Sequence, residues 1–135
     1  MSFTGGDLLE INYKHPTLGV GTLYPKSGEE FSVEKGGYKA SDDSGMITGD
    51  GQFIDQINRK RWEADGTVAW DSSIADEVEQ MNLLAADPVL ADWTFTHING
   101  TIWGGNGKPV GDIKGDAQKA QMKIKIAGGG KLIQL

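Results

Sequence analysis

The chain has no cysteine. It can therefore form no disulfide, no thiolate metal site and no cysteine nucleophile, and folding in a reducing cytosol is expected. Apolar runs are also short, and none approaches the roughly 18 residues of a membrane-spanning helix. The first six residues lack the basic and then apolar pattern of a secretory signal. From these absences we expect neither export nor a membrane anchor.

A surplus of positive charge is missing as well. The 135 residues carry 13 Lys and Arg against 19 Asp and Glu, a formal net charge of -6. A protein that grips nucleic acid by neutralising phosphates needs the opposite balance on some face. The charge is unevenly divided, because residues 117–135 contain lysines but no acidic residue. This basic stretch either meets an acidic surface of another copy or is simply solvated.

Motifs that would hold a cofactor or a metal ion are incomplete. The glycine-rich segment 104–111 fails as a phosphate-binding loop, because Pro109 stands where a Ser or Thr must follow Lys108. A calcium loop starting at Asp42 fails because its twelfth position is Phe53, where a Glu is required. The two histidines have no metal-binding spacing, and no nucleophile elbow occurs. We therefore predict that the chain is not an enzyme and holds no cofactor.

Glycine is abundant, at 20 residues, and it separates stretches in which apolar and polar residues alternate. This pattern is typical of an all-β chain. The clearest strand spans 59–70. Its inward side chains are Trp62, Ala64, Gly66, Val68 and Trp70, and its outward ones include Glu63, Asp65 and Thr67. A final strand has Met122, Ile124 and Ile126 inward and Gln121, Lys123 and Lys125 outward.

Further strands are expected earlier in the chain and between these two. In 7–13, Leu9, Ile11 and Tyr13 form one face, and a turn at His15-Pro16 separates this strand from the next, over 20–24. Short strands follow around Phe31 and Val33 and over 93–98 and 101–103, the last two as a hairpin around Asn99-Gly100. All four tryptophans fall in predicted strands, so core packing is favoured over ligand stacking. Both histidines are expected to be structural.

One helix is expected, between the two clear strands. Ser73 followed by Asp76 matches a capping box, Val78, Met81 and Ala85 recur at helical spacing, and Asp87-Pro88 ends the helix. Long loops are expected over 35–52 and 104–115, with a short tail at 131–135. These elements predict a single, mainly β domain over 1–135. We expect it to be an antiparallel β-sandwich or barrel with one flanking α-helix and long assembly loops.

Three stretches of sequence resemble phage tail tube proteins, and the likeness covers nearly the whole chain. These stretches are the opening MSFTGGDLL, the segment INGTIWGG with GKPVGD after it, and the ending AGGGKL. The resemblance implies a subunit of hexameric rings, stacked into a hollow tube through which the genome passes into the host. It implies a virion protein made in the host cytoplasm, with sheath, tape-measure and baseplate proteins as partners and DNA passing without specific binding. The compact domain favours a contractile tail.

The resemblance also suggests where subunits meet, because each subunit of that family gives strands to a sheet around the lumen. The loop over 35–52 is the predicted contact between subunits or rings, through Tyr38, Asp42, Asp43, Met46 and Ile47. The predicted lumen or interface face consists of Glu63, Asp65, Thr67, Lys123 and Lys125. The two lysines do not suit a uniformly acidic channel, so either they pair with acidic neighbours across a subunit boundary or their strand turns its polar face elsewhere. The alternative is a carbohydrate-binding β-sandwich module that uses a surface tryptophan.

Overall fold

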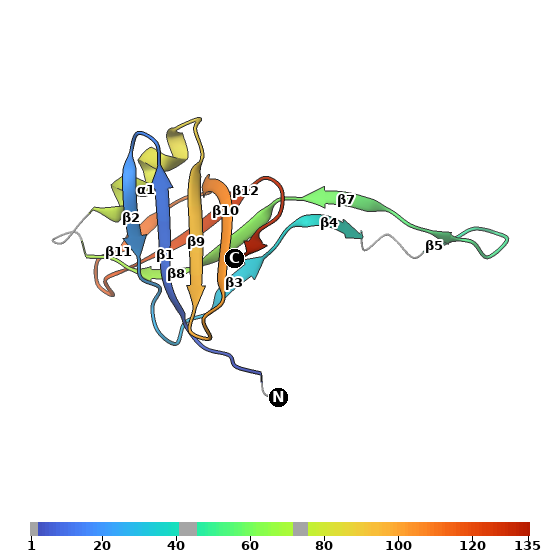
Figure 1. Cartoon of the computed structure of the whole chain (residues 1–135), viewed down its shortest axis with the longest axis horizontal. Helices are drawn as coiled ribbons and strands as arrows, with labels where there is room; N and C mark the ends of the chain where they lie inside the picture. The colour runs from blue at the N-terminus through green and yellow to red at the C-terminus, as the bar shows by residue number, and fades with distance from the viewer. Residues whose placement is uncertain (1–2, 41–45, 72–75) are drawn as a thin grey trace.

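A computed structural model describes residues 3–40, 46–71 and 76–135. These residues form an antiparallel β-structure with one helix, as expected, and a long arm that leaves its side (Figure 1). The main sheet has nine strands in the path β2-β1-β9-β10-β12-β8-β3, with β13 on β10 and β11 on β12. Among the described strands the sheet stays open, with β2 and β3 at its ends, so it is not a closed barrel.

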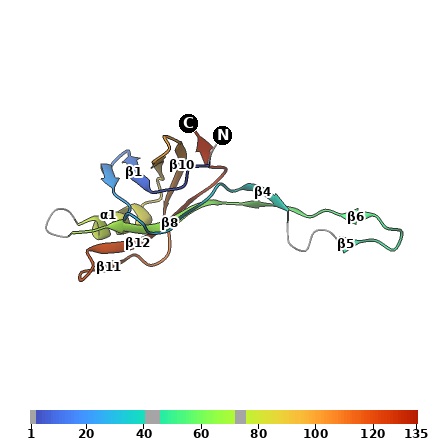
Figure 2. The ribbon, with the colours of Figure 1, turned by 90° about the horizontal axis from the view of Figure 1, so that it is seen from below.

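The main sheet folds into two layers that share β10. One layer contains β1 (Leu8–His15), β2 (Gly19–Leu23), β9 (Ala91–His97), β10 (Ile102–Pro109) and β13 (Ile133–Gln134). The other contains β3 (Phe31–Glu34), β8 (Trp62–Ala69), β11 (Lys114–Asp116) and β12 (Gln121–Gly128). Most of β10 pairs with β9, and its last two residues pair with β12. The strands β1 and β9 therefore cross in front of β8 and β12 (Figure 1), and the layers separate in the view from below (Figure 2).

The core lies between these layers and contains the large apolar side chains that alternation placed inward. Trp62, Phe95 and Ile11 are fully buried, and Trp62 meets Phe95 edge to face with ring centroids 6.0 Å apart. Helix α1 (Glu77–Ala86) adds Met81 and Leu84 to the same core. Burying each of these side chains contributes about 1.5–3 kcal/mol before the entropy of ordering is subtracted. The predicted inward packing of Trp62, Ala64 and Val68, and of Met122, Ile124 and Ile126, is confirmed, and Trp70 is partly buried against the same core.

Two boundaries of the predicted elements are shifted. Leu8, not Leu9, shares the buried face of Ile11 and Tyr13, because a bulge between Leu8 and Glu10 adds a residue to β1. The helix begins later than the capping box predicted: the cap is Asp76, whose carboxylate accepts a hydrogen bond from the Glu79 N–H at 3.2 Å. Ser73, the predicted cap, lies outside the described residues.

The predicted glycine-rich loop over 104–115 is wrong in its first half, because Gly104–Pro109 continue β10. Several glycines are required here because a larger side chain would collide with the Trp62 ring. A β-carbon on Gly105 or Gly107 would stand 2.9 or 2.8 Å from the Trp62 ring, and one on Gly128 would stand 2.6 Å from its indole nitrogen. These three glycines of β10 and β12 thus leave room for a buried indole, a role that is distinct from turn formation.

The predicted loop over 35–52 is largely β-structure in its described part. Strand β4 (Gly37–Ala40) pairs with β7 (Ile57–Lys60), and β5 (Met46–Ile47) pairs with β6 (Phe53–Ile54). Together these strands form a two-stranded arm, with 37–40 and 46–60 as its described residues, which projects far beyond the body of the domain (Figures 1 and 2). The strand predicted over 59–70 is accordingly divided at Arg61 into an arm strand and a core strand.

The chain does not end in a free tail. Leu132 is buried in the core, and β13 returns to the sheet beside β10, with Trp103 opposite Gln134. The Leu132 N–H donates to the Lys35 carbonyl at 2.9 Å, which fixes the end of the chain to the base of the arm. Residues 131–135 are thus part of the fold.

Candidate functional site

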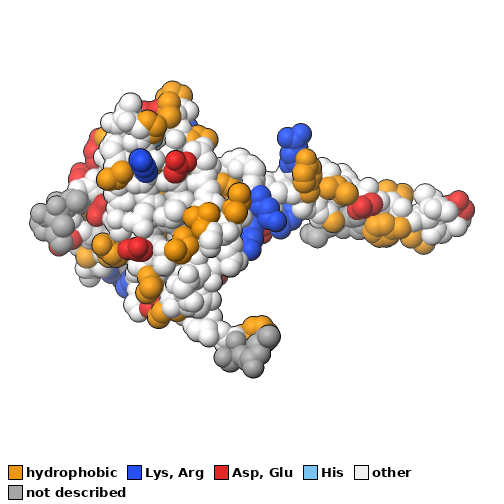
Figure 3. Space-filling model, viewed as in Figure 1, with side chains coloured by type: hydrophobic (Ala, Val, Ile, Leu, Met, Phe, Trp, Pro, Cys, Tyr) orange, Lys and Arg blue, Asp and Glu red, His pale blue; other side chains and the backbone are white. Residues whose placement is uncertain are grey.

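The arm exposes an unusual amount of apolar surface. Its exposed apolar side chains are Tyr38, Met46, Ile47, Phe53, Ile54 and Ile57, with 46–72% of each side chain accessible. Orange side chains accordingly follow the arm to its tip (Figure 3). Three of them, Tyr38, Met46 and Ile47, belong to the predicted contact loop. Sequence reasoning missed the other three, because they lie on the returning strands. Six such side chains on one narrow ribbon are the pattern of a protein-binding surface.

The backbone of the arm is also incompletely paired. Within the described chain, β4 pairs only with β7 and β5 only with β6, so each strand leaves one edge without hydrogen-bonded neighbours. A two-stranded ribbon of this kind is marginally stable in water by itself. Exposed strand edges readily pair with another chain. Both features indicate that the arm is completed by a partner.

The tip of the arm is a tight turn that holds an acidic residue. The Thr48 N–H donates to the Gln52 carbonyl at 2.8 Å, and the Thr48 hydroxyl donates to the Asp50 carboxylate. This hydroxyl bond lowers the pKa of Asp50 from its ordinary value. Asp42 and Asp43, the two acidic residues predicted at this contact, lie outside the described residues.

A second candidate surface is the outward face of β3, β8, β12 and β11. Antiparallel pairing places Asp65 opposite Lys125 and Thr67 opposite Lys123. Glu63, two residues before Asp65 on β8, lies on the same face of the sheet. The five residues predicted for this face therefore lie together on two neighbouring strands. A shallow groove of about 510 Å³ runs over four of them, all but Glu63, and Glu30 and Asp112 also line it.

One lysine of this charged face, Lys125, has a carboxylate neighbour within the same chain. The Lys125 Nζ lies 3.5 Å from Glu63 Oε2, and the Arg61 Nε lies 2.9 Å from Glu63 Oε1. The hydrogen bond from Arg61, together with the charge of Lys125, holds the pKa of Glu63 below its ordinary value. The sequence left open a pairing across a subunit boundary or a strand face turned elsewhere, and Lys125 instead has an acidic partner on the adjacent strand of its own chain. The face is thus mixed in charge, not uniformly acidic.

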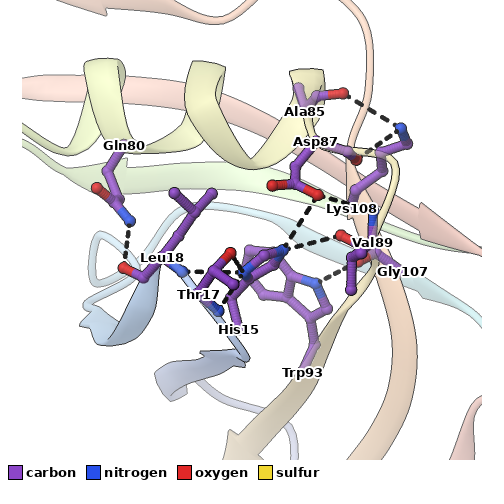
Figure 4. Close-up of polar contacts among 10 residues, drawn as sticks. All are labelled: His15, Thr17, Leu18, Gln80, Ala85, Asp87, Val89, Trp93, Gly107 and Lys108. Atoms are coloured by element: carbon purple, nitrogen blue, oxygen red, sulfur yellow. Dashed lines mark hydrogen bonds and ion pairs between the residues drawn. The ribbon is translucent and has the colours of Figure 1, made fainter.

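The histidines have structural contacts. His15 is buried, and its Nδ1 accepts hydrogen bonds from the Thr17 and Leu18 N–H groups at 3.1 and 3.0 Å (Figure 4). Its Nε2 therefore carries the hydrogen and donates to the Val89 carbonyl at 2.9 Å. This imidazole joins the β1–β2 turn to the segment between α1 and β9. The Nδ1 of His97 similarly accepts from the Asn99 N–H at 3.2 Å.

The tryptophans offer little to a sugar ligand. Trp62 and Trp93 are buried, and Trp70 and Trp103 are only partly accessible and pack against the core. Core packing, the favoured prediction, is confirmed, and the carbohydrate-module alternative loses its surface tryptophan. Within residues 3–40, 46–71 and 76–135, no cluster of His, Asp and Glu could hold a metal ion. No helix in that part of the chain is long and apolar enough to cross a membrane.

Comparison with known proteins gives similarity to solved structures only. No protein-family model matches the chain, and no curated protein matches it. The fold is similar to that of a chain in the cryo-EM structure of the anti-feeding prophage (AFP) baseplate, 6-fold symmetrised. The two chains are 14% identical with a TM-score of 0.44, over 100% of this chain and 97% of the other. A likeness at this level assigns no function, so function rests on the surfaces described above.

Proposed function

We propose that this chain is a structural subunit of a phage-tail-like particle and that it forms the tail tube, as hexameric rings stacked around a channel. The arm is the observation that carries this proposal. It places Met46, Ile47 and Phe53 far from the core, where they stabilise nothing in the isolated subunit. Burying such a side chain in a contact contributes about 1.5–3 kcal/mol. Burial of all six exposed side chains of the arm would offset part of the free-energy cost of association, which is about 4–15 kcal/mol.

The charged face is the second observation that supports the proposal, because it suits a channel through which DNA passes without adhering. Glu34, Glu63, Asp65 and Asp116 face outward from it together with Lys114, Lys123 and Lys125. Lys125 is held by Glu63, and a lysine beside a carboxylate attracts phosphate less than a free one. The outer edges of β3 and β11 are available to extend the sheet into neighbouring subunits. In this arrangement the face lines the lumen.

The proposed subunit has no catalytic task. Its partners are further copies of itself within and between rings, and sheath, tape-measure and baseplate proteins along a contractile tail. It resides in the virion after synthesis in the host cytoplasm, and it conducts the genome into the host. Each of these points follows from the tail tube proposal and is tested with it.

Assembly of the purified protein tests the proposal directly. Electron microscopy should show rings or tubes of wild-type protein, and substitution of Met46→Ser, Ile47→Ser and Phe53→Ser together should abolish them. Deleting 38–47 is a poorer test, since it would leave β6 and β7 without their partner strands. The matched control is Val20→Ser, Leu83→Ser and Val89→Ser, three exposed apolar side chains outside the arm. Wild-type protein that stays monomeric at high concentration contradicts the proposal.

A further inference from the structure

The base of the arm holds a basic groove that no part of the proposed function uses. The groove measures about 950 Å³, and six of its eleven lining residues are Lys or Arg, whereas none is acidic. We name it the arm-base groove, and its basic residues are Lys35, Lys39, Arg59, Lys60, Arg61 and Lys131. Blue side chains gather where the arm leaves the body (Figure 3). In a chain with a net charge of -6, this concentration of cations stands out.

Most of these cations have no carboxylate partner. Lys39 lies 3.0 Å from Glu34, and Arg61 lies 2.9 Å from Glu63. In the described part of the chain, Lys35, Arg59, Lys60 and Lys131 form no ion pair. Six cations less the two paired with carboxylates leave a local charge of about +4. Such a groove fits a ligand with several negative charges.

The side of the body away from the arm carries a matching set of carboxylates. Asp76, Glu77 and Glu79 surround the start of α1, and we name this set the acidic pole. Figure 1 places the start of α1 at the other end of the long axis from the arm. No Lys or Arg among the described residues forms an ion pair with Asp76, Glu77 or Glu79. Burial, with added repulsion from Asp71 and Asp76, raises the pKa of Glu77.

We propose that the arm-base groove of one subunit binds the acidic pole of the next subunit in the ring, an inference that rests on the proposed tube. A ring of identical subunits uses a heterologous contact, in which two different surfaces of the chain meet. Surfaces on opposite sides of the body can satisfy this requirement all round a closed ring. The charges, about +4 against about -3, are complementary and would fix the direction of assembly.

A second copy fits the groove better than nucleic acid does. The same chain supplies the complementary carboxylates in equal stoichiometry, so every groove has its ligand in every ring. A groove that held DNA would slow a genome passing through the tube, because phosphate contacts bind without regard to sequence. Nucleic acid binding is therefore an outcome that would overturn the inference.

Charge reversal in the groove is the first test. Arg59→Glu with Lys60→Glu should raise the protein concentration needed for ring formation at least about tenfold, because it removes the attraction between neighbours. The control, Lys14→Glu with Lys119→Glu, changes the net charge equally at exposed positions outside both surfaces and should assemble like wild type. Ring formation by the groove variant at the wild-type concentration overturns the inference and leaves the tube proposal standing.

Mixing two reversed variants is the decisive test. The groove variant replaces Lys35, Arg59, Lys60 and Lys131 with Glu, which changes its local charge from about +4 to about -4. The pole variant is Asp76→Asn, Glu77→Gln, Glu79→Lys and Asn82→Lys, in which Asn keeps the helix cap and the local charge changes from about -3 to about +2.

Each variant alone should fail to form rings, since like charges then meet at every contact. An equal mixture should restore rings, because alternating copies of the two variants match the charge at every contact of a six-membered ring. Circular dichroism confirms that both variants fold. A mixture that stays unassembled, although each variant is folded, overturns the inference.

Two outcomes distinguish failure of this inference from failure of the tube proposal on which it rests. If wild-type protein forms no rings at any concentration, the tube proposal fails and the inference fails with it. If wild-type protein binds a short DNA duplex and Arg59→Glu with Lys60→Glu abolishes this binding, the groove is a nucleic-acid site and the inference is overturned.

Discussion

The indole of Trp62 lies against Gly128 so closely that a β-carbon on the glycine would stand 2.6 Å from the indole nitrogen. The Asn106 carbonyl oxygen, from the neighbouring strand β10, is closer still to that position. Trp62 is fully buried, so it has no space into which it can move. Packing at this point is therefore intolerant of a single added methyl group.

Gly128→Ala should destabilise the subunit by about 3 kcal/mol, because the new methyl group must displace either the backbone of β10 or the Trp62 ring. Urea unfolding followed by tryptophan fluorescence measures the loss. The adjacent Gly129→Ala is the control, since a β-carbon there would meet nothing within 4 Å. Equal stability of the two variants would contradict this account of the β10 and β12 glycines.

Leu132→Ala should cost about 3 kcal/mol, because Leu132 is 1% exposed and its removal leaves a cavity in the core. Ile133→Ala, one residue further on, removes a side chain that is 61% exposed and should cost less than about 0.5 kcal/mol. Thermal unfolding of the two variants distinguishes them. A loosely attached chain end would give two small and similar losses.

His15→Ala should destabilise the subunit by about 3 kcal/mol, because the Thr17 and Leu18 N–H groups lose their common acceptor. His15→Asn should cost roughly half as much, since a side-chain oxygen can replace Nδ1 while the bond to Val89 is lost. Lys14→Ala, at an exposed neighbour, is the control. Urea unfolding gives all three values, and an Asn variant no more stable than Ala would show that the turn does not depend on the Nδ1 acceptor.

Glu77→Gln should raise the stability of the isolated subunit at pH 7. Burial, with repulsion from Asp71 and Asp76, raises the pKa of Glu77 above its ordinary value of 4.5, so ionisation costs more in the folded than in the unfolded chain. In wild type this cost is absent below pH 4.5 and develops as pH rises through the folded pKa. The advantage of the Gln variant should therefore disappear on acidification.

The free energy of unfolding of Glu77→Gln and wild type, measured from pH 4 to pH 7 in dilute protein, checks this expectation. Glu79→Gln removes the same charge from an exposed side chain of the same helix and should show no such gain. A constant difference between Glu77→Gln and wild type across the range would mean that the Glu77 carboxylate is not the cause.

Alternation predicted the core strands well because their two faces meet different surroundings. In β8, Trp62, Ala64 and Val68 are buried and Asp65 is exposed, so the pattern is visible in the sequence. The arm strands were missed for the opposite reason. Both of their faces meet solvent, and β7 is exposed at every residue, so no periodic pattern arises.

Other features depended on partners distant in sequence. The glycines of β10 resemble loop residues until Trp62, more than 40 positions earlier, is placed against them. The arm-base groove collects its cations from 35–39, 59–61 and 131, and none of these short runs is distinctive alone. The charged face could be predicted, because β8 and β12 each present an alternating set. Their pairing, which brings Glu63 to Lys125, required the register.

The order of strands also governs when the subunit can fold. Strand β1 pairs with β9, about eighty residues later in the sequence, and β10 pairs with β13 (Ile133–Gln134). Such distant pairings slow folding, because a long loop must close before its contacts form. During synthesis β1 therefore emerges long before its partner, and the core is sealed only when Leu132 has left the ribosome. A nascent chain thus cannot complete its sheet until residues 132–134 have emerged.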